Sequence, residues 1–201
     1  MEFWDRVAGV YDIAEAFNGN VYRRICDITR RLTPRGAKVL DCAAGTGELS
    51  FAAARKAESV VCTDISENML KKARAKFVRI GNVTFETRNI FDMKDPDDTY
   101  DVVIAGNVLH LLEDPEKAVR ELYRVLKPGG RLLLPTFMTK SKSNSVLLKL
   151  YRLIGYSAAA DYQPSEYKKM LINCGCGKVR TKLINGYVPC CYAVIEKTER
   201  N

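Results

Sequence analysis

The chain has 201 residues, of which 47% are hydrophobic, and 32 Lys and Arg stand against 24 Asp and Glu for a formal net charge of +8. A chain of this length can bury a full core, so we predict a single domain over residues 1–201 that needs no disulfide staple. No apolar run reaches the roughly eighteen residues of a transmembrane helix, and the first residues are not a signal peptide, so we expect a cytoplasmic protein. The positive charge leaves contact with polyanions or with an anionic membrane surface open.

The first segment, residues 1–35, is predicted to be a helical cap ahead of a sheet. A helix is expected near Val21 to Leu32, and we interpret its arginines as a solvated face. Phe3, Trp4 and Tyr11 precede it and have the composition of a surface helix that packs through aromatic side chains.

The segment Val39–Glu48 predicts a buried strand that runs into a turn of small residues and then into a helix. Gly45, Gly47 and the alanines before them leave the backbone bare, so that a ligand can touch it. A helix that begins at the end of a strand is a typical site for a nucleotide-like ligand. Asp41 lies beside this turn, where an acid would repel a pyrophosphate and would suit a cationic ligand.

A second strand is predicted within Ser59–Leu70, with Asp64 at its end and Ser66 as the N-cap of the next helix. Asp64 follows the turn by about twenty residues, the spacing at which an acid accepts hydrogen bonds from ribose hydroxyls. The alternative is that Asp64 only caps the helix.

Two more strands are expected, one alternating within Val83–Asp92 and one continuously apolar within Tyr100–His110. Asp114 and Pro115 then predict the start of a helix that stops at residues 127–130, before a strand at Arg131–Leu134. With residues 36–137 as a core of alternating strands and helices, the pattern indicates a parallel α/β sheet.

Residues 138–177 are predicted to be an insert with helices near 145–156 and 164–173. The last segment, 178–201, has the pattern of a hairpin with strands at Lys178–Leu183 and Val188–Glu196 and a turn at Asn185-Gly186.

Together, the Val39–Glu48 turn, the Asp64 motif and the run ELYRVLKPGGRLLL at 121–134 resemble the class I S-adenosylmethionine-dependent methyltransferases. The resemblance is to the branch that includes small-molecule and ubiquinone/menaquinone C-methyltransferases. It implies a Rossmann-like seven-stranded methyltransferase sheet whose last strand is antiparallel, with helices on both faces and an N-terminal helical cap. The chain departs from the family at Ala43, where a glycine is usual.

The resemblance also implies a cofactor, S-adenosyl-L-methionine, and S-adenosyl-L-homocysteine as its product. Asp64 would bind the ribose, Ile65 and Met69 would pack on the adenine, Asn89 would accept from its amino group, and the backbone amide of Ile90 would serve the ring. The remaining expected cofactor-binding residues belong to the first turn or to the end of the fourth strand: Asp41, Ala43, Ala44, Gly45, Gly47, Ala105, Gly106 and Asn107.

The chemistry needs a nucleophile placed in line with an electrophilic methyl group, and a base only where the acceptor must lose a proton. His110, the single histidine, follows the fourth strand and is the candidate base, although a packed, hydrogen-bonded histidine is the alternative. By resemblance, Tyr11 would close the site, with packing as its alternative. The acceptor pocket is expected from Tyr11, residues 107–110 and residues 140–163, whose composition favours an apolar or aromatic acceptor.

Several functions stay open at this level. Methyl transfer to a small apolar or aromatic acceptor is the main hypothesis, and the alternatives are a quinone-type C-methyltransferase, an RNA methyltransferase and a catalytically silent cofactor-binding module. Nucleic acid ranks low as a substrate because Asn107 is followed by Val108-Leu109-His110 and not by two prolines and an aromatic residue. The sequence indicates no obligate protein partner.

No metal site is predicted. The pairs Cys174/Cys176 and Cys190/Cys191 are expected at opposite ends of the sheet, too far apart to share an ion, and neighbours in a strand point to opposite faces.

Overall fold

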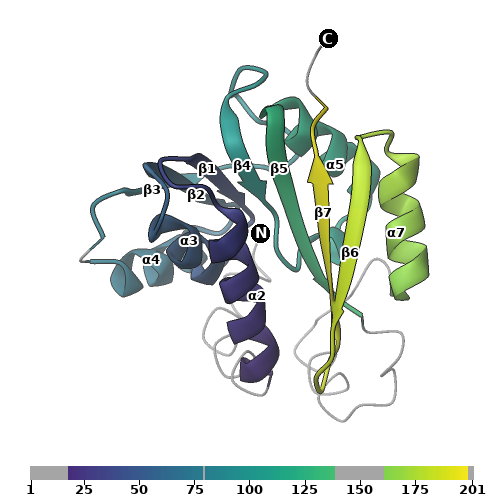
Figure 1. Ribbon diagram of the computed structural model, residues 1–201. Coiled ribbons are helices and arrows are strands. Elements are labelled where there is room, and N and C mark those ends of the chain that lie inside the picture. Colours follow the sequence, from purple (N-terminus) through teal and green to yellow (C-terminus); the bar gives the residue numbers. More distant parts are fainter. Residues whose placement is uncertain (1–17, 79, 139–160, 199–201) are drawn as a thin grey trace.

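The computed structural model describes residues 18–78, 80–138 and 161–198, which form one mixed sheet with helices packed against it (Figure 1). The strands are β1 (Lys38–Cys42), β2 (Ser59–Asp64), β3 (Val83–Thr87), β4 (Tyr100–Ile104), β5 (Leu126–Phe137), β6 (Lys178–Ile184) and β7 (Cys190–Glu196). The helices are α2 (Gly19–Leu32), α3 (Glu48–Ala54), α4 (Glu67–Lys76), α5 (Pro115–Arg124), α7 (Pro164–Asn173) and the short 3-10 helix η1 (Leu109–Leu111).

The seven strands lie in the order β3-β2-β1-β4-β5-β7-β6. β1 to β5 are parallel, and β7 runs antiparallel to both of its neighbours, β5 and β6. The order reverses between β1 and β4, and in open α/β sheets ligands bind at the carboxyl ends of the strands at such a point. The predicted seven-stranded Rossmann-like sheet with an antiparallel last strand is therefore confirmed.

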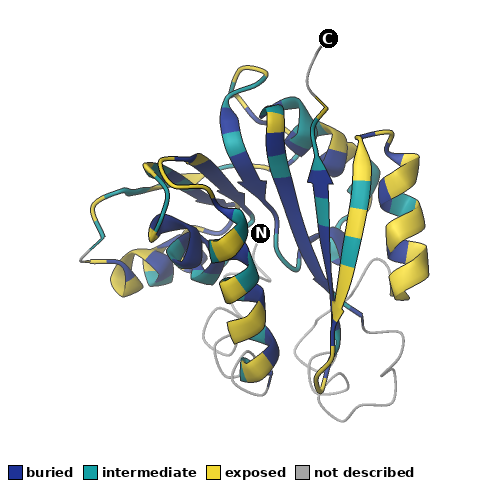
Figure 2. Ribbon diagram, in the orientation of Figure 1, coloured by how far each residue is buried: buried dark blue, intermediate teal, exposed yellow. Residues whose placement is uncertain are grey.

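Two hydrophobic clusters, one on each face of the sheet, explain how the helices are held. On one face α2 and α3 pack through Val21, Ile25 and Leu49 against side chains of the central strands. On the other face α5 and α7 pack through residues such as Leu122 and Tyr167. The central strands are buried on both faces, as their continuous apolar runs predicted (Figure 2).

Local signals place the helix starts correctly. The Asp114 side chain accepts a hydrogen bond of 2.9 Å from the backbone amide of Lys117, and Pro115 opens α5. The Ser66 hydroxyl accepts from the Met69 amide at 3.2 Å and caps α4. Each cap satisfies a backbone donor that the helix itself leaves without an acceptor.

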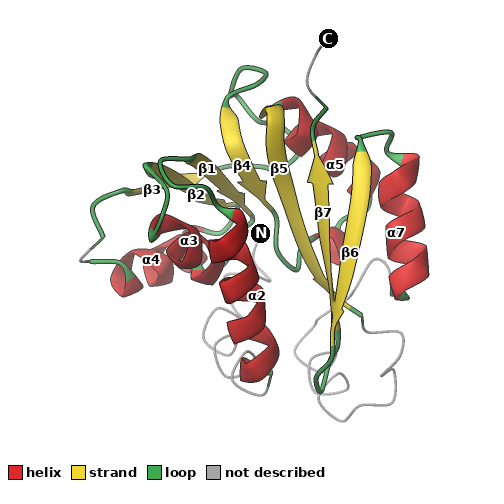
Figure 3. Cartoon of the chain, viewed as in Figure 1, coloured by secondary structure: helices red, strands yellow, loops and turns green. Residues whose placement is uncertain are grey.

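Two predicted boundaries are wrong (Figure 3). The turn expected at residues 127–130 is a bulge inside β5, because Leu126 already pairs with Tyr100 while Arg131 pairs with Val102. The hairpin turn is longer than Asn185-Gly186: β6 ends at Ile184 opposite Cys190, which leaves residues 185–189 as the loop.

The loop 185–189 is held by contacts that no local pattern reveals. The Asn18 side chain donates to the Val188 carbonyl at 2.8 Å, and a Cβ on Gly186 would meet Val21 at 2.1 Å. Tyr11, the rest of residues 1–17, and the helix expected near 145–156 lie outside the described residues.

Candidate functional site

The turn between β1 and α3 has three residues in the left-handed region: Ala43 (φ 53°), Gly45 (φ 57°) and Gly47 (φ 83°). This conformation costs an L-residue such as Ala43 about 1–2 kcal/mol, and glycine adopts it without that cost. Ala43, Ala44 and Gly45 are partly exposed, so their backbone forms a bare surface at the carboxyl end of β1. The sequence prediction of a ligand-accessible turn agrees with this geometry.

Gly47 is the tightest point of the turn. A Cβ built on it would lie 2.6 Å from a ring carbon of Phe77. Phe77 in turn stacks on Phe51 of α3 and on Phe85 of β3, with ring centroids 5.4 and 6.0 Å apart. The aromatic stack therefore presses the start of α3 against α4, and only glycine fits at this position.

Asp41 is a buried carboxylate behind the turn. One oxygen, Oδ2, accepts a hydrogen bond of 2.7 Å from the Ser50 hydroxyl, and the other, Oδ1, is buried with no donor among the described residues. Burial raises the pKa of Asp41 to about 7, against the lowering effect of Ser50. A half-satisfied buried acid at a ligand edge is suited to a cationic ligand, which would compensate its charge.

Asp64 ties the first turn to the second. Its Oδ2 accepts from the Gly45 amide at 2.8 Å and its Oδ1 from the Ser66 amide at 2.9 Å. A carboxylate oxygen can accept more than one hydrogen bond, so ribose hydroxyls could be accepted in addition to these amides. The geometry is compatible with both roles considered from the sequence, which are capping of the next helix and binding of the ribose.

The residues expected at the adenine differ in exposure. Ile65 has 41% of its surface exposed and offers an apolar face, whereas Met69 is only 2% exposed and packs within the fold. Ile65 is thus the more accessible of the two, and the adenine contacts of both residues stay predictions. Asn89 is exposed and its Oδ1 accepts from the Phe91 amide at 3.0 Å, which leaves one lone pair on that oxygen. Ile90, next to it, is buried.

The end of β4 supplies the third part of the site. Ala105 is fully buried, and a Cβ on Gly106 would lie 2.5 Å from the Leu49 side chain, so the strand passes close beneath α3. Asn107 has a left-handed backbone conformation (φ 54°), and its backbone amide donates to the Pro135 carbonyl at 2.7 Å. Its side-chain carbonyl oxygen is buried with no donor among the described residues, as is Oδ1 of Asp41.

His110, the candidate base, is a buried imidazole. It lies in η1, is 3% exposed, and its burial lowers the pKa of the imidazole to about 4. At neutral pH such a ring is uncharged and binds a proton weakly, while an effective base has a pKa near the working pH. This burial fits the packed-histidine alternative, and the role of His110 as a base stays a prediction.

The cysteines have the environment of packing residues. Cys190 lies opposite Phe137 at one end of the sheet, and Cys176 precedes Lys178, which pairs with Glu196 at the other end. Burial raises the pKa of Cys174 and of Cys191 to about 11, so these thiols stay protonated at neutral pH. Within residues 18–78, 80–138 and 161–198 no group of three His, Cys, Asp or Glu side chains could hold a metal ion.

Comparison with known proteins bears on the same segments. Residues 40–134, from β1 through most of β5, match the family model of a methyltransferase domain. A ubiquinone/menaquinone biosynthesis C-methyltransferase UbiE from a Marinomonas species is 38% identical over 151 residues, which is 71% of this chain and 59% of that protein. The UbiE protein of Cronobacter sakazakii is 43% identical over 109 residues, 51% of this chain and 43% of that protein.

The chain belongs to the class I S-adenosylmethionine-dependent methyltransferases. It spans about half the length of the curated methyltransferases that it matches. A Haloferax volcanii methyltransferase, solved in complex with the Trm112 methyltransferase activator, superposes with a TM-score of 0.75 at 16% identity and covers 96% of this chain and 97% of that one. At that identity the likeness shows the methyltransferase fold alone.

Two residues that support this candidate site escaped the sequence analysis. Ser50 is a buried hydroxyl on the otherwise apolar inner face of α3, and this mismatch was the available signal that it serves Asp41. Tyr22 of α2 accepts a hydrogen bond of 3.3 Å from the Asn107 side chain and packs edge-on against Phe137, with centroids 5.6 Å apart. No local pattern could reveal the bond between Tyr22 and Asn107, because 85 residues separate them.

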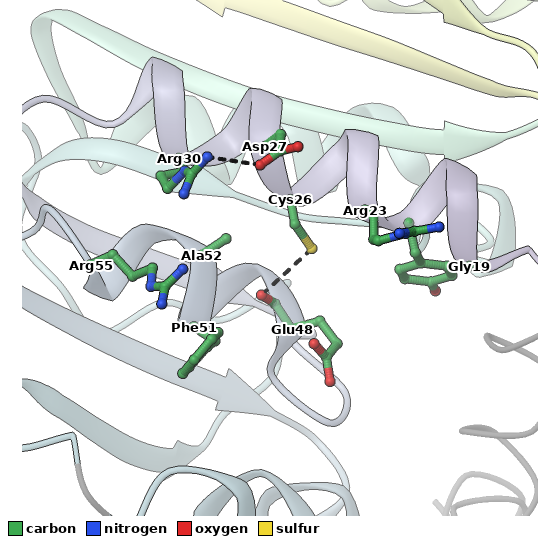
Figure 4. Close-up of a pocket in the computed structure, with 10 residues that line it drawn as sticks. Gly19, Arg23, Cys26, Asp27, Arg30, Glu48, Phe51, Ala52 and Arg55 are labelled. Atoms are coloured by element: carbon green, nitrogen blue, oxygen red, sulfur yellow. Dashed lines mark hydrogen bonds and ion pairs between the residues drawn. The ribbon is translucent and has the colours of Figure 1, made fainter.

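Tyr22 also lines a pocket of about 440 Å³ between α2 and α3 (Figure 4). The floor includes Cys26, Phe51 and Ala52, and arginines from both helices surround it. Glu48, the residue after Gly47, lies at one end, so the methyltransferase turn and this pocket are neighbours.

Proposed function

We propose that this protein transfers a methyl group from S-adenosyl-L-methionine to a small apolar or aromatic acceptor. The observation that carries the proposal is the meeting of three chain segments at one edge of the sheet. The bare left-handed turn after β1, the acid Asp64 after β2 and the small residues after β4 all lie at the carboxyl ends of neighbouring strands. Open α/β sheets bind their ligands at this place.

The residues present fit this cofactor. Asp64, and Asp41 when it is ionised, place negative charge around the turn, which suits a ligand with a sulfonium and an ammonium group. The buried oxygens of Asp41 and Asn107 that lack a donor are acceptors for such a ligand. Asp64 would hold the ribose hydroxyls, the backbone at Ala43–Gly47 would lie against the cofactor, and Ile65 would cover the adenine.

When bound, the cofactor supplies an electrophilic methyl group, so the protein mainly positions an acceptor. The chain's own contribution is to order the edge of the sheet on which the acceptor rests. Tyr22 links α2 to Asn107, and the ring contact with Phe137 fixes this link over β5. The aromatic rings of Tyr22 and Phe137 support an apolar acceptor over a sugar or a polyanion.

Among acceptors, a quinone-type aromatic ring methylated at carbon is the class that the curated relatives support, because both are named for ubiquinone/menaquinone biosynthesis. The chain shares 38–43% identity with them over their matched parts. The RNA and cofactor-binding-only alternatives have no observation in their favour among the described residues.

The cofactor assignment is tested through Asp64. We expect Asp64→Ala to weaken binding of S-adenosyl-L-homocysteine by ten- to a hundredfold, because losing two hydrogen bonds to a charged acceptor costs roughly 1.5–3 kcal/mol. Isothermal titration calorimetry measures the affinity, and Asp92→Ala, which removes an exposed carboxylate paired with Lys94, is the matched control.

An unchanged affinity in Asp64→Ala would contradict the ribose assignment, and a wild-type protein that preferred NAD would contradict the proposal as a whole. Turnover is tested with radiolabelled cofactor and a pool of quinone precursors, phenols and RNA. Product in the phenol or quinone fraction supports the proposal, whereas product in RNA alone, or tight cofactor binding without any transfer, would overturn the acceptor class.

A further inference from the structure

The face of β6 that lies on the α2 side of the sheet carries three cations in a row. Lys178, Arg180 and Lys182 alternate along the strand and are all exposed, while Val179 packs on the opposite face with α5 and α7. Side chains two apart in a strand point the same way. No described helix covers this part of the sheet, which lies in the open beside α2 (Figure 1).

The flank of α2 that faces β7 adds two arginines. Ile28 packs with Val194 of β7 in the same hydrophobic cluster, so this side of the helix is turned toward β7. Arg24 precedes Ile28 by four residues and Arg31 follows it by three, and residues at these spacings share a helix face. Both arginines are exposed, and neither is among the α2 residues that line the pocket between α2 and α3.

Arg131 of β5 joins the two groups. It donates to the Leu32 carbonyl at the end of α2 at 3.0 Å, and it lies 3.6 Å from the Glu196 carboxylate. Arg180 pairs with the same carboxylate. We name this surface the basic face, and its residues are Arg24, Arg31, Arg131, Lys178, Arg180 and Lys182, with Glu196 as its acid.

Exposed apolar side chains lie near the basic face, at the edge of the sheet that holds the candidate site. Leu183 is near the end of β6, on the face of the strand opposite Lys182, and is 48% exposed, whereas Tyr187, in the β6–β7 loop, is 51% exposed. The loop is held by the bond from Asn18 to Val188 and by the close approach of Gly186 to Val21. These contacts hold the exposed Tyr187 side chain beyond the end of β6.

We propose that the basic face, with Leu183 near the end of β6 and Tyr187 in the β6–β7 loop, docks this protein on an anionic lipid bilayer. Each cation held near an anionic membrane surface raises the binding constant by roughly fivefold, and the effect is screened by salt. Leu183 and Tyr187 supply an apolar side chain and an aromatic ring of the kind found at membrane interfaces. Docking here would bring the carboxyl edge of the sheet to the lipid, where an apolar acceptor dissolves.

A bilayer fits this surface better than RNA does. Single-stranded nucleic acids bind basic grooves in which aromatic rings stack on the bases. Among the described residues Tyr187 is the one aromatic side chain with a large exposed surface, and it lies at the end of the basic face and not along it. The choice of a bilayer also rests on the proposed apolar acceptor.

The test is vesicle flotation of the full chain. One set of vesicles contains phosphatidylcholine alone, and the other contains phosphatidylcholine with about 30% of the anionic lipid phosphatidylglycerol. We expect binding to the anionic vesicles only, and weaker binding at higher salt. The variant Arg180→Glu/Lys182→Glu should bind at least tenfold more weakly, whereas the control Lys94→Glu/Lys169→Glu, on other surfaces, should stay within about twofold. Leu183→Ser should reduce the binding that persists at high salt.

Several outcomes would overturn the proposal: equal binding to neutral vesicles, equal loss in the control variant, no flotation at all, or capture of an RNA oligonucleotide that depends on Arg180 and Lys182. Titration with S-adenosyl-L-homocysteine runs beside each assay. If the wild-type protein binds S-adenosyl-L-homocysteine but does not float with the vesicles, the membrane proposal alone is contradicted. If the wild-type protein does not bind S-adenosyl-L-homocysteine, the proposed function is contradicted.

Discussion

Two buried side chains next to the candidate site, Asp41 and His110, have pKa values displaced in opposite directions by the same cause. Burial disfavours the charged form of each group, so it raises the pKa of Asp41 to about 7 and lowers the pKa of His110 to about 4. Both are therefore driven toward neutrality. The carboxyl group of Asp41 then titrates within the physiological pH range, whereas the imidazole of His110 titrates below it.

For Asp41 the sign of the pH dependence follows directly. Between about pH 4 and pH 7 the folded protein holds a proton at Asp41 that the unfolded chain has released, so the contribution of this group to the free energy of unfolding falls as pH rises. Asp41→Asn removes that slope. We expect the variant to gain on the order of 1–3 kcal/mol relative to wild type between pH 5 and pH 8. Urea unfolding at both pH values measures the difference, and a pH-independent difference would contradict the assignment.

His110 has the opposite slope, because its stabilising effect is lost as pH falls from about 6.5 toward 4, where the unfolded chain takes up a proton first. Its prediction concerns catalysis. We expect His110→Ala to destabilise the fold by about 2–3 kcal/mol through the cavity it leaves. Turnover per folded molecule should stay within about threefold of wild type. A fall of 10²–10⁴-fold with normal cofactor affinity would restore His110 as the base.

At the level of elements, the unit that makes the site is β1 with its turn and α3. β1 is buried on both faces, and the turn reverses direction through three left-handed residues, Ala43, Gly45 and Gly47. Asp64 at the end of β2 then binds the amide of Gly45, so the two loops form one surface. The turn is rigid because of contacts from α4 and β3, and not because of its own sequence alone.

Gly47→Ala tests this unit. The alanine methyl would meet Phe77 at 2.6 Å in a backbone conformation (φ 83°) that already costs an L-residue about 1–2 kcal/mol. We expect a loss of about 2–4 kcal/mol in the free energy of unfolding and weaker cofactor binding. Gly81→Ala, where a Cβ has nothing within 4 Å, is the matched control and should change either quantity little. Equal effects in the two variants would show that the turn is less tightly packed than the contacts indicate.

In the molecule as a whole, the candidate site joins strands on both sides of the β1/β4 switch point, where the two halves of the sheet meet. A ligand bound across this point contacts only the folded state, so it stabilises the entire sheet by mass action. No helix among the described residues is long and apolar enough to cross a membrane.

This linkage predicts a thermal shift. S-adenosyl-L-homocysteine at a hundred times its dissociation constant should add about 2.7 kcal/mol, which raises the melting temperature by roughly 5–10 °C in a chain of this size. Differential scanning calorimetry measures the shift, and NADH at the same concentration should produce none. A shift that survives unchanged in Asp64→Ala would place the ligand elsewhere on the molecule.

The sequence by itself determined the elements and the cofactor edge. Residues 38–42, 59–64 and 100–104 are apolar runs bounded by turn residues, and parallel strands must end at one edge, so Asp64 and Gly45 could be brought together without coordinates. The helix starts at Ser66 and Asp114 followed from capping, which is a contact between near neighbours in the chain. Patterns of this kind are readable because the interacting groups lie a few residues apart.

Only the tertiary structure decided the rest. The burial of His110 and Met69, the bond from Tyr22 to Asn107 and the long loop after β6 depend on elements that meet from distant parts of the chain. The basic face is of the same kind, since its cations come from α2, β5 and β6. Burial and pKa are set by what packs around a side chain from every direction, and a sequence pattern records only the neighbours along the chain.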